Sequence, residues 1–245
     1  MVRYTNVRIR CGTHGRNITD DWYGEHGTMA RTVGSNGPKT MEAIRKAGLR
    51  LIYSQGYEAM SLRRLAAEVG IQAGSLYNHI NTKQDLLFDL IKVHMDELLE
   101  RLDQALEGIS DPEDRLQAFI AFHVGYHIAR KREVFICYSE LRSLEPKNYE
   151  IVVGLRQQYE RKLIGILDDG VAECRFTVAD TTVAAYGILA MLTGVCTWFR
   201  PAGRMTKEEV VGIYTGMVRH GLVRAANHTT STGHQTDADP ITLIR

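Results

Sequence analysis

The stretch Ser61–Lys83, SLRRLAAEVGIQAGSLYNHINTK, constrains the fold of this chain more than any other. Its first half repeats apolar residues at the spacing of one helical face, and it ends at Gly70, where a helix C-cap favours a residue that tolerates positive φ. A second apolar face follows within Gln72–Ile80. The pattern predicts two short helices joined by a tight turn. The apolar positions are Leu62, Leu65, Ala66 and Val69 in the first helix and Ala73, Leu76 and Ile80 in the second.

The second of these helices, Gln72–Ile80, leaves small and hydrogen-bonding side chains facing outward. Such a helix fits the major groove of DNA, because the base edges there present hydrogen-bond donors and acceptors. The spacing therefore predicts a helix-turn-helix in which Gln72–Ile80 reads DNA. Taken alone, the same stretch is equally typical of a helical hairpin whose outer face is merely solvated.

Both flanks favour the helix-turn-helix. Upstream, Met41–Gln55 has the pattern of a helix with one apolar face, and Gly56 ends it. Downstream, Thr82 and Asp85 form a variant of the capping box at the start of a helix that is expected to reach about Gly108. This helix begins at the predicted DNA-binding end and continues into the rest of the chain, so we expect it to link the two halves mechanically.

This order of elements resembles the DNA-binding domain of the TetR family of transcriptional regulators. The resemblance is dense in this region and continues more weakly, by helical pattern alone, through the rest of the chain. The sequence departs from the family at Gln72, where a Ser or Thr N-cap is usual, and at Ile80, where Phe is common. The matching positions are Gly56, Ser61, Arg63, Leu65, Ala66, Val69, Gly70, Gly74, Leu76, Tyr77, His79, Lys83 and Leu86.

The resemblance implies an all-α protein with an N-terminal three-helix helix-turn-helix domain and a C-terminal helical ligand-binding and dimerisation domain. We place the first domain at residues 39–85 and the second at residues 86–226. We expect a disordered N-terminal extension at residues 1–38, in which Met29 is the native start, and a flexible tail at residues 227–245. Arg31 and Lys39 are expected to lie along the DNA backbone or minor groove, or else to be solvated.

The same resemblance implies that a homodimer binds a near-palindromic double-stranded DNA operator. Base-edge contacts are expected from the outward face of the reading helix, and phosphate contacts from its surroundings. The predicted base-contacting residues are Gln72, Ala73, Ser75 and Asn78; the predicted phosphate contacts are Ser61, Arg63, Tyr77, His79 and Lys83; and Gly74 completes the DNA-binding set.

Charge and composition agree with this interpretation. The net charge of +1 conceals seven Lys/Arg against three Asp/Glu in residues 39–83, a net +4, and 18 against 23 in residues 84–245, a net −5. A basic end suits a protein that contacts phosphate with that end only. The four cysteines show no paired spacing, so a cytoplasmic protein without disulfides or a zinc ribbon is expected. We expect no membrane segment, because no apolar run reaches about 18 residues.

An effector site is expected in the C-terminal domain, where the predicted helix Pro112–Arg130 is unusually aromatic. The ending Cys196–Gly203, with Trp198-Phe-Arg-Pro, resembles that of TetR-type regulators of lipid and steroid breakdown, some of which sense acyl-CoA thioesters. The alternatives are a hydrophobic drug or natural product as effector, and a structural role for Trp198 at the dimer edge. The predicted effector-binding residues are Phe119, His123, Tyr126, Tyr138, Arg142, Arg156, Trp198 and Arg200.

Catalysis is not expected. His123 and His127 have the i, i+4 spacing of a chelating pair, with Cys137 and Glu140 as further candidates, but a half-buried pair lining an aromatic pocket is the better interpretation. No nucleophile elbow or phosphate-binding loop is present in the sequence, so we predict a non-enzyme with no cofactor and no metal. The rival interpretations are a helical small-molecule-binding or metal-binding protein without DNA function, and a metal-dependent helical enzyme.

The last two predicted helices, Val178–Arg200 and Thr206–Arg224, are rich in small residues. Glycine inside a helix costs about 1 kcal/mol relative to alanine, so several of them suggest close helix-helix approach. In the TetR family the two helices pair with their twofold mates in a four-helix bundle; the alternative is close packing within one subunit. The predicted dimer-interface residues are Ala184, Gly187, Gly194, Gly212 and Gly216.

Overall fold

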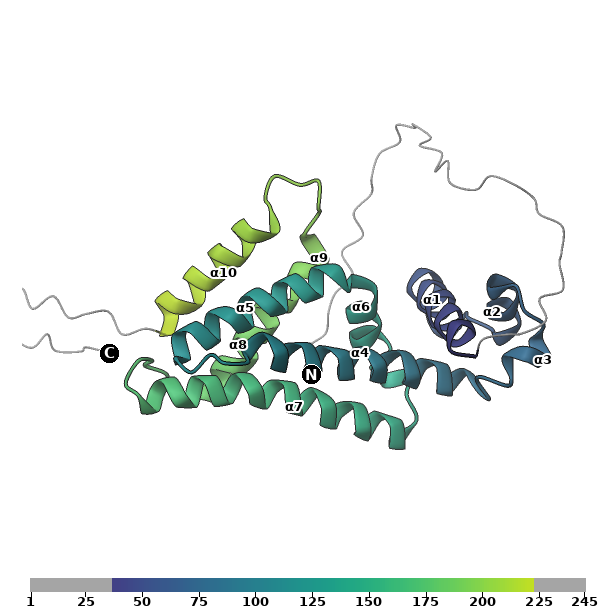
Figure 1. Ribbon diagram of the computed structural model, residues 1–245, viewed down its shortest axis with the longest axis horizontal. Helices are drawn as coiled ribbons and strands as arrows, with labels where there is room; N and C mark the ends of the chain where they lie inside the picture. Colours follow the sequence, from purple (N-terminus) through teal and green to yellow (C-terminus); the bar gives the residue numbers. More distant parts are fainter. Residues whose placement is uncertain (1–36, 223–245) are drawn as a thin grey trace, which may run out of the picture. The chain divides into compact units, whose positions relative to one another are not determined.

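The computed structural model describes residues 37–222, and this part of the chain contains helices and no β-strand (Figure 1). The predicted extension, its Met29 start and Arg31, and the predicted tail lie outside the described residues. The elements are α1 (Gly37–Gln55), α2 (Leu62–Val69), α3 (Ala73–Leu76), α4 (Lys83–Leu106), α5 (Pro112–Ala129), α6 (Lys131–Ser139), the 3₁₀ turn η1 (Leu141–Ser143), α7 (Pro146–Ala172), α8 (Thr181–Thr193), α9 (Val195–Trp198) and α10 (Lys207–Leu222).

The first helix, α1, begins at Gly37 rather than at Met41, so the prediction of disorder was wrong for residues 37 and 38. Proline is tolerated in the first turn of a helix, where its missing N–H has no intrahelical partner, and Pro38 stands there. The predicted inward face is confirmed: Ile44, Ala47, Leu51 and Ile52 are all buried.

The turn between α2 and α3 has the predicted chemistry. Ser61 caps α2 by accepting a hydrogen bond from the Arg64 N–H at 3.3 Å, and Gly70 ends it with φ of +76°. Substitution of Gly70 by a residue with a Cβ would strain this conformation. The turn thereby fixes the direction in which α3 leaves α2.

The reading helix α3 is shorter than expected. Regular α-helix covers only Ala73–Leu76, and the chain continues to Ile80 in further helical turns, in which the Asn78 and His79 N–H groups bond to carbonyls three residues back at 3.3 and 2.9 Å. The Gln72 side chain makes no capping bond, in line with the weak cap predicted there. Leu76 and Ile80 are buried, but Ala73 is exposed, so its placement in the core was wrong.

Helix α4 links the two halves of the described chain, as predicted. Its capping box is complete: the Asp85 N–H donates to Thr82 Oγ1 at 3.0 Å, and the Thr82 N–H donates to Asp85 Oδ2 at 3.0 Å. The helix packs on α1 near its start and on α5, α6 and α7 further along. It runs without a break through the predicted domain boundary after residue 85.

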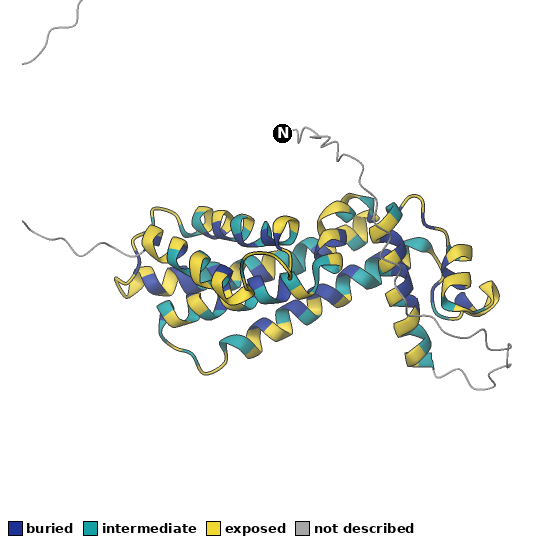
Figure 2. Cartoon of the chain, turned by 90° about the horizontal axis from the view of Figure 1, so that it is seen from above, coloured by how far each residue is buried: buried dark blue, intermediate teal, exposed yellow. Residues whose placement is uncertain are grey.

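The C-terminal body is built around α5, which packs against α4, α7, α8 and α10. Figure 2 shows the resulting burial on the sides of these helices that face one another. Asp111 caps α5, and the predicted Pro112 follows it. Gly170 closes the end of α7 against the Phe176 ring, since a Cβ at residue 170 would lie 2.1 Å from that ring.

The helix expected over Val178–Arg200 is interrupted. Asp180 is its N-cap and accepts from the Val183 N–H at 2.9 Å, and Gly194 separates α8 from α9 while keeping helical φ and ψ of −53° and −23°. Helix α10 begins with a capping box, in which the Thr206 N–H donates to Glu209 Oε2 at 2.7 Å and the Glu209 N–H donates to Thr206 Oγ1 at 3.2 Å. Helix α10 packs on α5, while α8 packs on α7 and α5.

By length and apolar composition alone, the 18 residues Thr181–Trp198 could cross a membrane, contrary to the expectation that no run is that long. Gly194 divides this stretch, and α8 itself has only 13 residues. A helix rises 1.5 Å per residue and needs about 20 residues to span the hydrocarbon core of a bilayer. A protein surface therefore explains the apolar side chains of α8 better than lipid does.

Candidate DNA-binding surface and ligand cavity

The outward surface of α3 has the predicted composition. Gln72, Ala73, Gly74, Ser75 and Asn78 are exposed, as is Tyr77, and none of these side chains makes a hydrogen bond within the described residues. His79 is half-buried and lies beside the core residue Ile80. The base-reading face is thus small, polar and free of intramolecular partners.

The cations around α3 fall into two groups. Arg45 pairs with Asp89 at 2.7 Å, Lys46 pairs with Glu42, and Arg64 donates to Gln55 at 2.6 Å. Arg63 and Lys39 are exposed, and neither has an ion pair among residues 37–222. These two are the cations that remain available for phosphate.

Lys83 has a different environment from the one expected of a simple phosphate contact. Its Nζ donates to the Glu58 carbonyl at 3.1 Å and lies 4.1 Å from the centroid of the Tyr57 ring. The ammonium therefore holds the turn between α1 and α2 against the start of α4. Ser61 is likewise engaged as the cap of α2, although its hydroxyl is exposed.

Polar contacts join the predicted DNA-binding head, which consists of α1–α3 and the start of α4, to the C-terminal body. The Tyr57 N–H donates to Glu140 Oε1 at 3.4 Å, and Gln84 donates to the Ser143 carbonyl at 2.6 Å and accepts from the Glu145 N–H at 3.1 Å. Glu140, Ser143 and Glu145 all follow α6, so the segment after α6 contacts the head directly. The sequence predicted α4 alone as the link.

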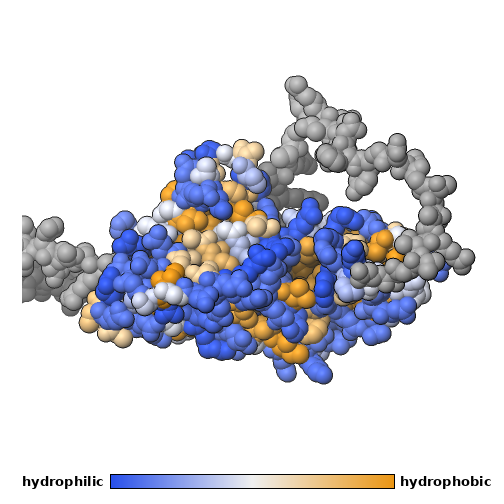
Figure 3. Space-filling view, viewed as in Figure 1, coloured by the Kyte–Doolittle hydropathy of each residue, from blue (hydrophilic) through white to orange (hydrophobic). Residues whose placement is uncertain are grey.

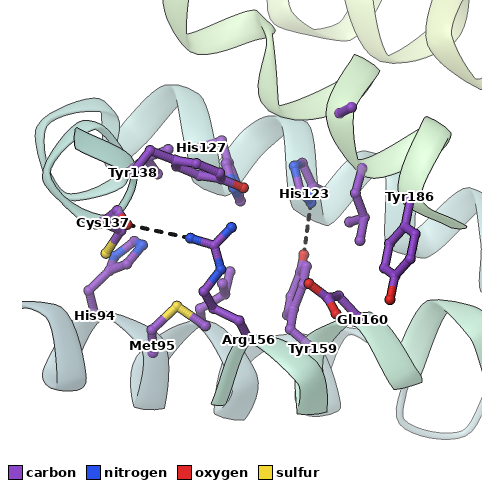
Figure 4. A pocket seen from close by; sticks show the side chains of 14 residues that line it. His94, Met95, His123, His127, Cys137, Tyr138, Arg156, Tyr159, Glu160 and Tyr186 are labelled. Carbon is purple, nitrogen blue, oxygen red and sulfur yellow. Dashed lines mark hydrogen bonds between the residues drawn. The ribbon is translucent and has the colours of Figure 1, made fainter. Parts of the chain in front are cut away.

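The body encloses a cavity of about 220 Å³ (Figure 4). Of the predicted effector residues, His123, Tyr138 and Arg156 line it. The half-exposed Tyr138 and Tyr186 stand at opposite ends of this view, and both contact solvent. Residues from five helices, α4 to α8, form the walls.

The other predicted effector residues do not line the cavity. Phe119 and Tyr126 are buried behind its wall; the Phe119 ring lies 6.0 Å from that of His123. Trp198 is half-exposed, and its ring lies 6.4 Å from the Tyr214 ring of α10. Arg142 is exposed in η1, and Arg200 donates only to nearby backbone carbonyls, at 3.0 and 3.3 Å.

Several lining residues were missed from the sequence. The clearest case is His94 with Met95, which occupies the buried stripe of α4 between Ile91 and Leu98. A histidine inside a Leu/Ile stripe was a usable signal, because a buried polar group needs a partner. His127 was expected beside His123 in an aromatic pocket, and it does line the cavity, although both are buried and not half-buried. The remaining missed residues are Leu98, Val134, Cys137, Tyr159, Glu160, Tyr186, Leu189 and Ala190.

Three histidines of the cavity are neutral at physiological pH. Burial lowers the pKa of His94 to about 4, with a smaller contribution from Arg130. Burial, and then the neighbouring His94, lowers the pKa of His127 to about 3. Burial, and then His127, lowers the pKa of His123 well below its ordinary value. The histidines therefore supply hydrogen bonds to the cavity and no charge.

The pair His123 and His127 is arranged for stacking rather than chelation. The two rings are nearly parallel, with centroids 3.7 Å apart. His123 Nδ1 lies 3.0 Å from the Tyr159 hydroxyl, and its Nε2 lies 3.1 Å from Thr193 Oγ1, so both nitrogens already have protein partners. In the described part of the chain, no group of three His, Cys, Asp or Glu is placed to hold a metal ion.

Arg156 supplies the cavity's positive charge. Its Nη1 donates to the Cys137 carbonyl at a long 3.5 Å, and its guanidinium lies 4.5 Å from the centroid of the Tyr138 ring. Within residues 37–222 it has no ion pair with a carboxylate. A half-buried guanidinium without an anion suits an anionic or carbonyl oxygen of a ligand.

Helices α8 and α10 carry exposed apolar side chains, and Figure 3 shows hydrophobic residues gathered around α9 and α10. Val183, Ile213 and Met217 are 66%, 50% and 55% exposed. A Cβ built at Gly187, Gly212 or Gly216 would meet no atom within 4 Å, so packing within one subunit does not explain these glycines. Gly194 differs, because its Cβ would lie 3.2 Å from the Met191 carbonyl oxygen, and Ala184 is half-buried.

A helix-turn-helix with a free reading surface, joined by α4 to a helical body with a cavity, defines a DNA-binding transcription regulator with a ligand-binding domain. Residues 44–90 match the family described as bacterial regulatory proteins, tetR family, and residues 110–222 match the tetracyclin repressor-like C-terminal domain. The chain belongs to the TetR family of bacterial transcriptional regulators, which confirms the resemblance and the all-α fold predicted from the sequence.

Individual relatives agree. The chain is 25% identical over 201 residues to the HTH-type transcriptional repressor KstR2 of Mycolicibacterium smegmatis, covering 80% of this chain and 97% of that one. The TetR family regulator PfmR from Thermus thermophilus superposes with a TM-score of 0.67 at 31% identity, over 74% of this chain and 99% of that one. The structure of AibR in complex with isovaleryl coenzyme A and operator DNA has a TM-score of 0.67 at 28% identity, over 73% and 97%. KstR2 and PfmR are transcriptional regulators, not enzymes.

Proposed function

We propose that this protein is a homodimeric repressor that binds a near-palindromic operator and releases it when a ligand fills the cavity. The observation that carries the proposal is one chain with a free reading surface on α3 and a cavity in the body, connected by α4 and by the contacts after α6. TetR regulators bind operator DNA as dimers, and the exposed apolar face of α8 and α10 supports the same assembly here. The two readers would sit about one helical turn of DNA apart or somewhat more. Such a function places the protein in the cytoplasm.

We infer further that the effector is an acyl-CoA-type thioester. AibR, a relative, was crystallised with isovaleryl coenzyme A and operator DNA. A whole acyl-CoA is far larger than the cavity here, so only the acyl end would enter it. Arg156 and Tyr138 line the cavity, and Arg142 follows Tyr138 along the chain. The two arginine cations favour binding of the anionic nucleotide at the Tyr138 end of the cavity. Glu160 lines the cavity from α7 and disfavours phosphates near itself.

The test is a fluorescence-anisotropy titration with DNA from the protein's own promoter, repeated with a panel of acyl-CoA thioesters and their free acids. We expect operator binding with a dissociation constant of nanomolar order, which the matching thioester weakens. The free acid should weaken it much less, because it lacks the phosphates of coenzyme A. Failure to bind any promoter fragment would favour a small-molecule-binding protein without DNA function. Release by an uncharged hydrophobic compound, and by no thioester, would replace the acyl-CoA effector with a drug-like one.

The contacts of the reading surface are tested by two substitutions. Asn78→Ala should change which base is preferred at one operator position, at a cost of about 1–3 kcal/mol, because a base-edge hydrogen bond is lost. Arg63→Ala should weaken all sequences alike and lower the salt slope of binding by about one, because Arg63 is exposed and unpaired among the described residues. The checks are binding to a set of single-base operator variants and to one operator across salt concentrations.

Lys83→Ala serves as the comparison for Arg63→Ala. Since Lys83 also holds the Glu58 carbonyl and the Tyr57 ring, its loss should reduce the thermal stability of the head as well as DNA affinity. An Arg63→Ala variant that alters base preference with an unchanged salt slope would show that the assignment of Arg63 to phosphate is wrong.

A further inference from the structure

Among residues 37–222, two buried histidines of the cavity each have a ring nitrogen without a hydrogen-bond partner. His94 and His127 are each 4% exposed, and Nδ1 of each is buried without a partner. Within the described residues, neither imidazole makes a hydrogen bond of normal geometry, although the backbone of His123 acts on His127 and opposes the lowering of its pKa. His123 provides the contrast, since Tyr159 and Thr193 satisfy both of its nitrogens. Of the three cavity histidines, His123 therefore has partners at both ring nitrogens, whereas His94 and His127 each have an unpaired ring nitrogen within the described residues.

An incomplete buried imidazole is unusual. A neutral imidazole has one N–H donor and one acceptor nitrogen, and a buried polar group without a partner costs about 1–3 kcal/mol. Most buried polar groups in folded proteins are hydrogen-bonded to protein or to ordered water. The apolar lining residues Met95, Leu98 and Val134 offer these rings no hydrogen-bond partner, and the polar neighbours His123 and Arg156 are bonded elsewhere. Nδ1 of each ring is closed off from the cavity, so an occupant can reach only the other ring nitrogen, Nε2, which makes no hydrogen bond within residues 37–222.

The two rings reach the cavity from different walls. His94 rises from α4 and His127 descends from α5, and Arg156 extends between these walls from α7 (Figure 4). An occupant held by Arg156 at one oxygen thus has further hydrogen-bonding groups on both sides. A purely hydrocarbon group would cover the imidazoles and leave them unsatisfied.

We propose that the cavity selects an acyl group that carries its own keto or hydroxyl oxygen, which hydrogen-bonds to His94 or His127, over the plain alkyl group of the same length. This inference rests on the proposed function, because it names the chemistry of the effector that enters the cavity. A keto oxygen accepts from an imidazole N–H, and a hydroxyl can both donate and accept. A site built for such a bond rejects the analogue that lacks it, because the polar group of the site is then left unpaired.

The experiment uses the full-length protein without DNA and measures binding by isothermal titration calorimetry. The probes are butyryl-CoA, 3-hydroxybutyryl-CoA and acetoacetyl-CoA, which share a four-carbon chain. We expect at least one oxygenated thioester to bind about tenfold or more tightly than butyryl-CoA. A second set, cyclohexanone and cyclohexanol against methylcyclohexane, measures the same preference by thermal shift without the CoA group.

Two apolar variants locate the preference. His94→Leu and His127→Leu should each reduce it, and the double variant should bring it to within about twofold of unity. Neither change should lower the melting temperature of the ligand-free protein, because each removes an unsatisfied polar group; a histidine with a purely structural role would behave in the opposite way. Met95→Leu, a neighbouring apolar change in the same wall, should keep the preference.

The outcomes separate the two proposals. Equal binding of oxygenated and plain probes in both sets, or a full preference in the double variant, overturns this inference. If no thioester binds but cyclohexanone or cyclohexanol is preferred over methylcyclohexane, the acyl-CoA effector fails and the oxygen preference stands. Release of operator DNA is measured separately, so its failure would count against the repressor mechanism alone.

Discussion

Gly187→Glu is expected to convert the dimer into monomers and to lower operator affinity by about 100-fold or more. Gly187 lies on α8 one turn after the exposed Val183, directly after the exposed Tyr186 and one turn before Met191, with open space where a Cβ would stand. The subunit alone can therefore accept a larger residue. Across a subunit interface the same residue overpacks and buries an unpaired charge, which costs about 3–5 kcal/mol. One half-site then offers too few contacts for tight binding.

Sedimentation velocity and operator titration are the measurements for this variant. Gly212→Glu on α10 should repeat the result, since its surroundings are also open. Gly154→Glu is the matched control, because it makes the same change in open space on α7 and should leave the dimer intact. Gly194→Glu is a poorer test, since Gly194 is close to its own backbone. An intact Gly187→Glu dimer would refute the assignment of this face.

Arg156→Ala is expected to shift the response to the effector to about 10- to 100-fold higher effector concentration while leaving ligand-free operator affinity nearly unchanged. Arg156 lines the cavity and is half-buried without an ion pair among the described residues, whereas it makes no contact with the DNA-binding head there. A hydrogen bond to a charged group contributes about 1.5–3 kcal/mol, so ligand affinity should fall by about 10- to 100-fold. The measurement is the operator titration with and without the effector.

Arg200→Ala is the control for this substitution. It also removes a guanidinium, and Arg200 follows the last cavity-lining residues along the chain. However, Arg200 is exposed and donates only to the backbone carbonyls of Thr197 and Phe199. The response of this variant to the effector should equal that of the wild type. If Arg200→Ala loses the response and Arg156→Ala keeps it, the effector lies near α9 and not in this cavity.

The local structure of the DNA-binding head could be predicted from the sequence. Ser61, Gly70 and the Thr82–Asp85 capping box act within a few residues of themselves, and each was found in the predicted role. The buried face of α1 was equally predictable, because helical periodicity reports which residues share a side. Helical periodicity was a poor guide at α3, because its regular helix has only four residues and the apolar pattern does not repeat within it. The exposed Ala73 was therefore wrongly placed in the core.

What periodicity cannot report is the neighbour that each face meets, and this was decided by the tertiary structure. The sequence indicated aromatic and basic residues for an effector site, but only packing showed that Arg156 enters the cavity while Arg200 does not. Trp198 lies beside Tyr214 of α10, and no local signal in the sequence reports that contact between two helices. The sequence does not show whether His94 has a hydrogen-bond partner, because the groups that could pair with it lie on helices α5 and α6, which are distant along the chain. Caps, turns and buried faces follow from short-range interactions, whereas the cavity and its unpaired groups exist only where several helices converge.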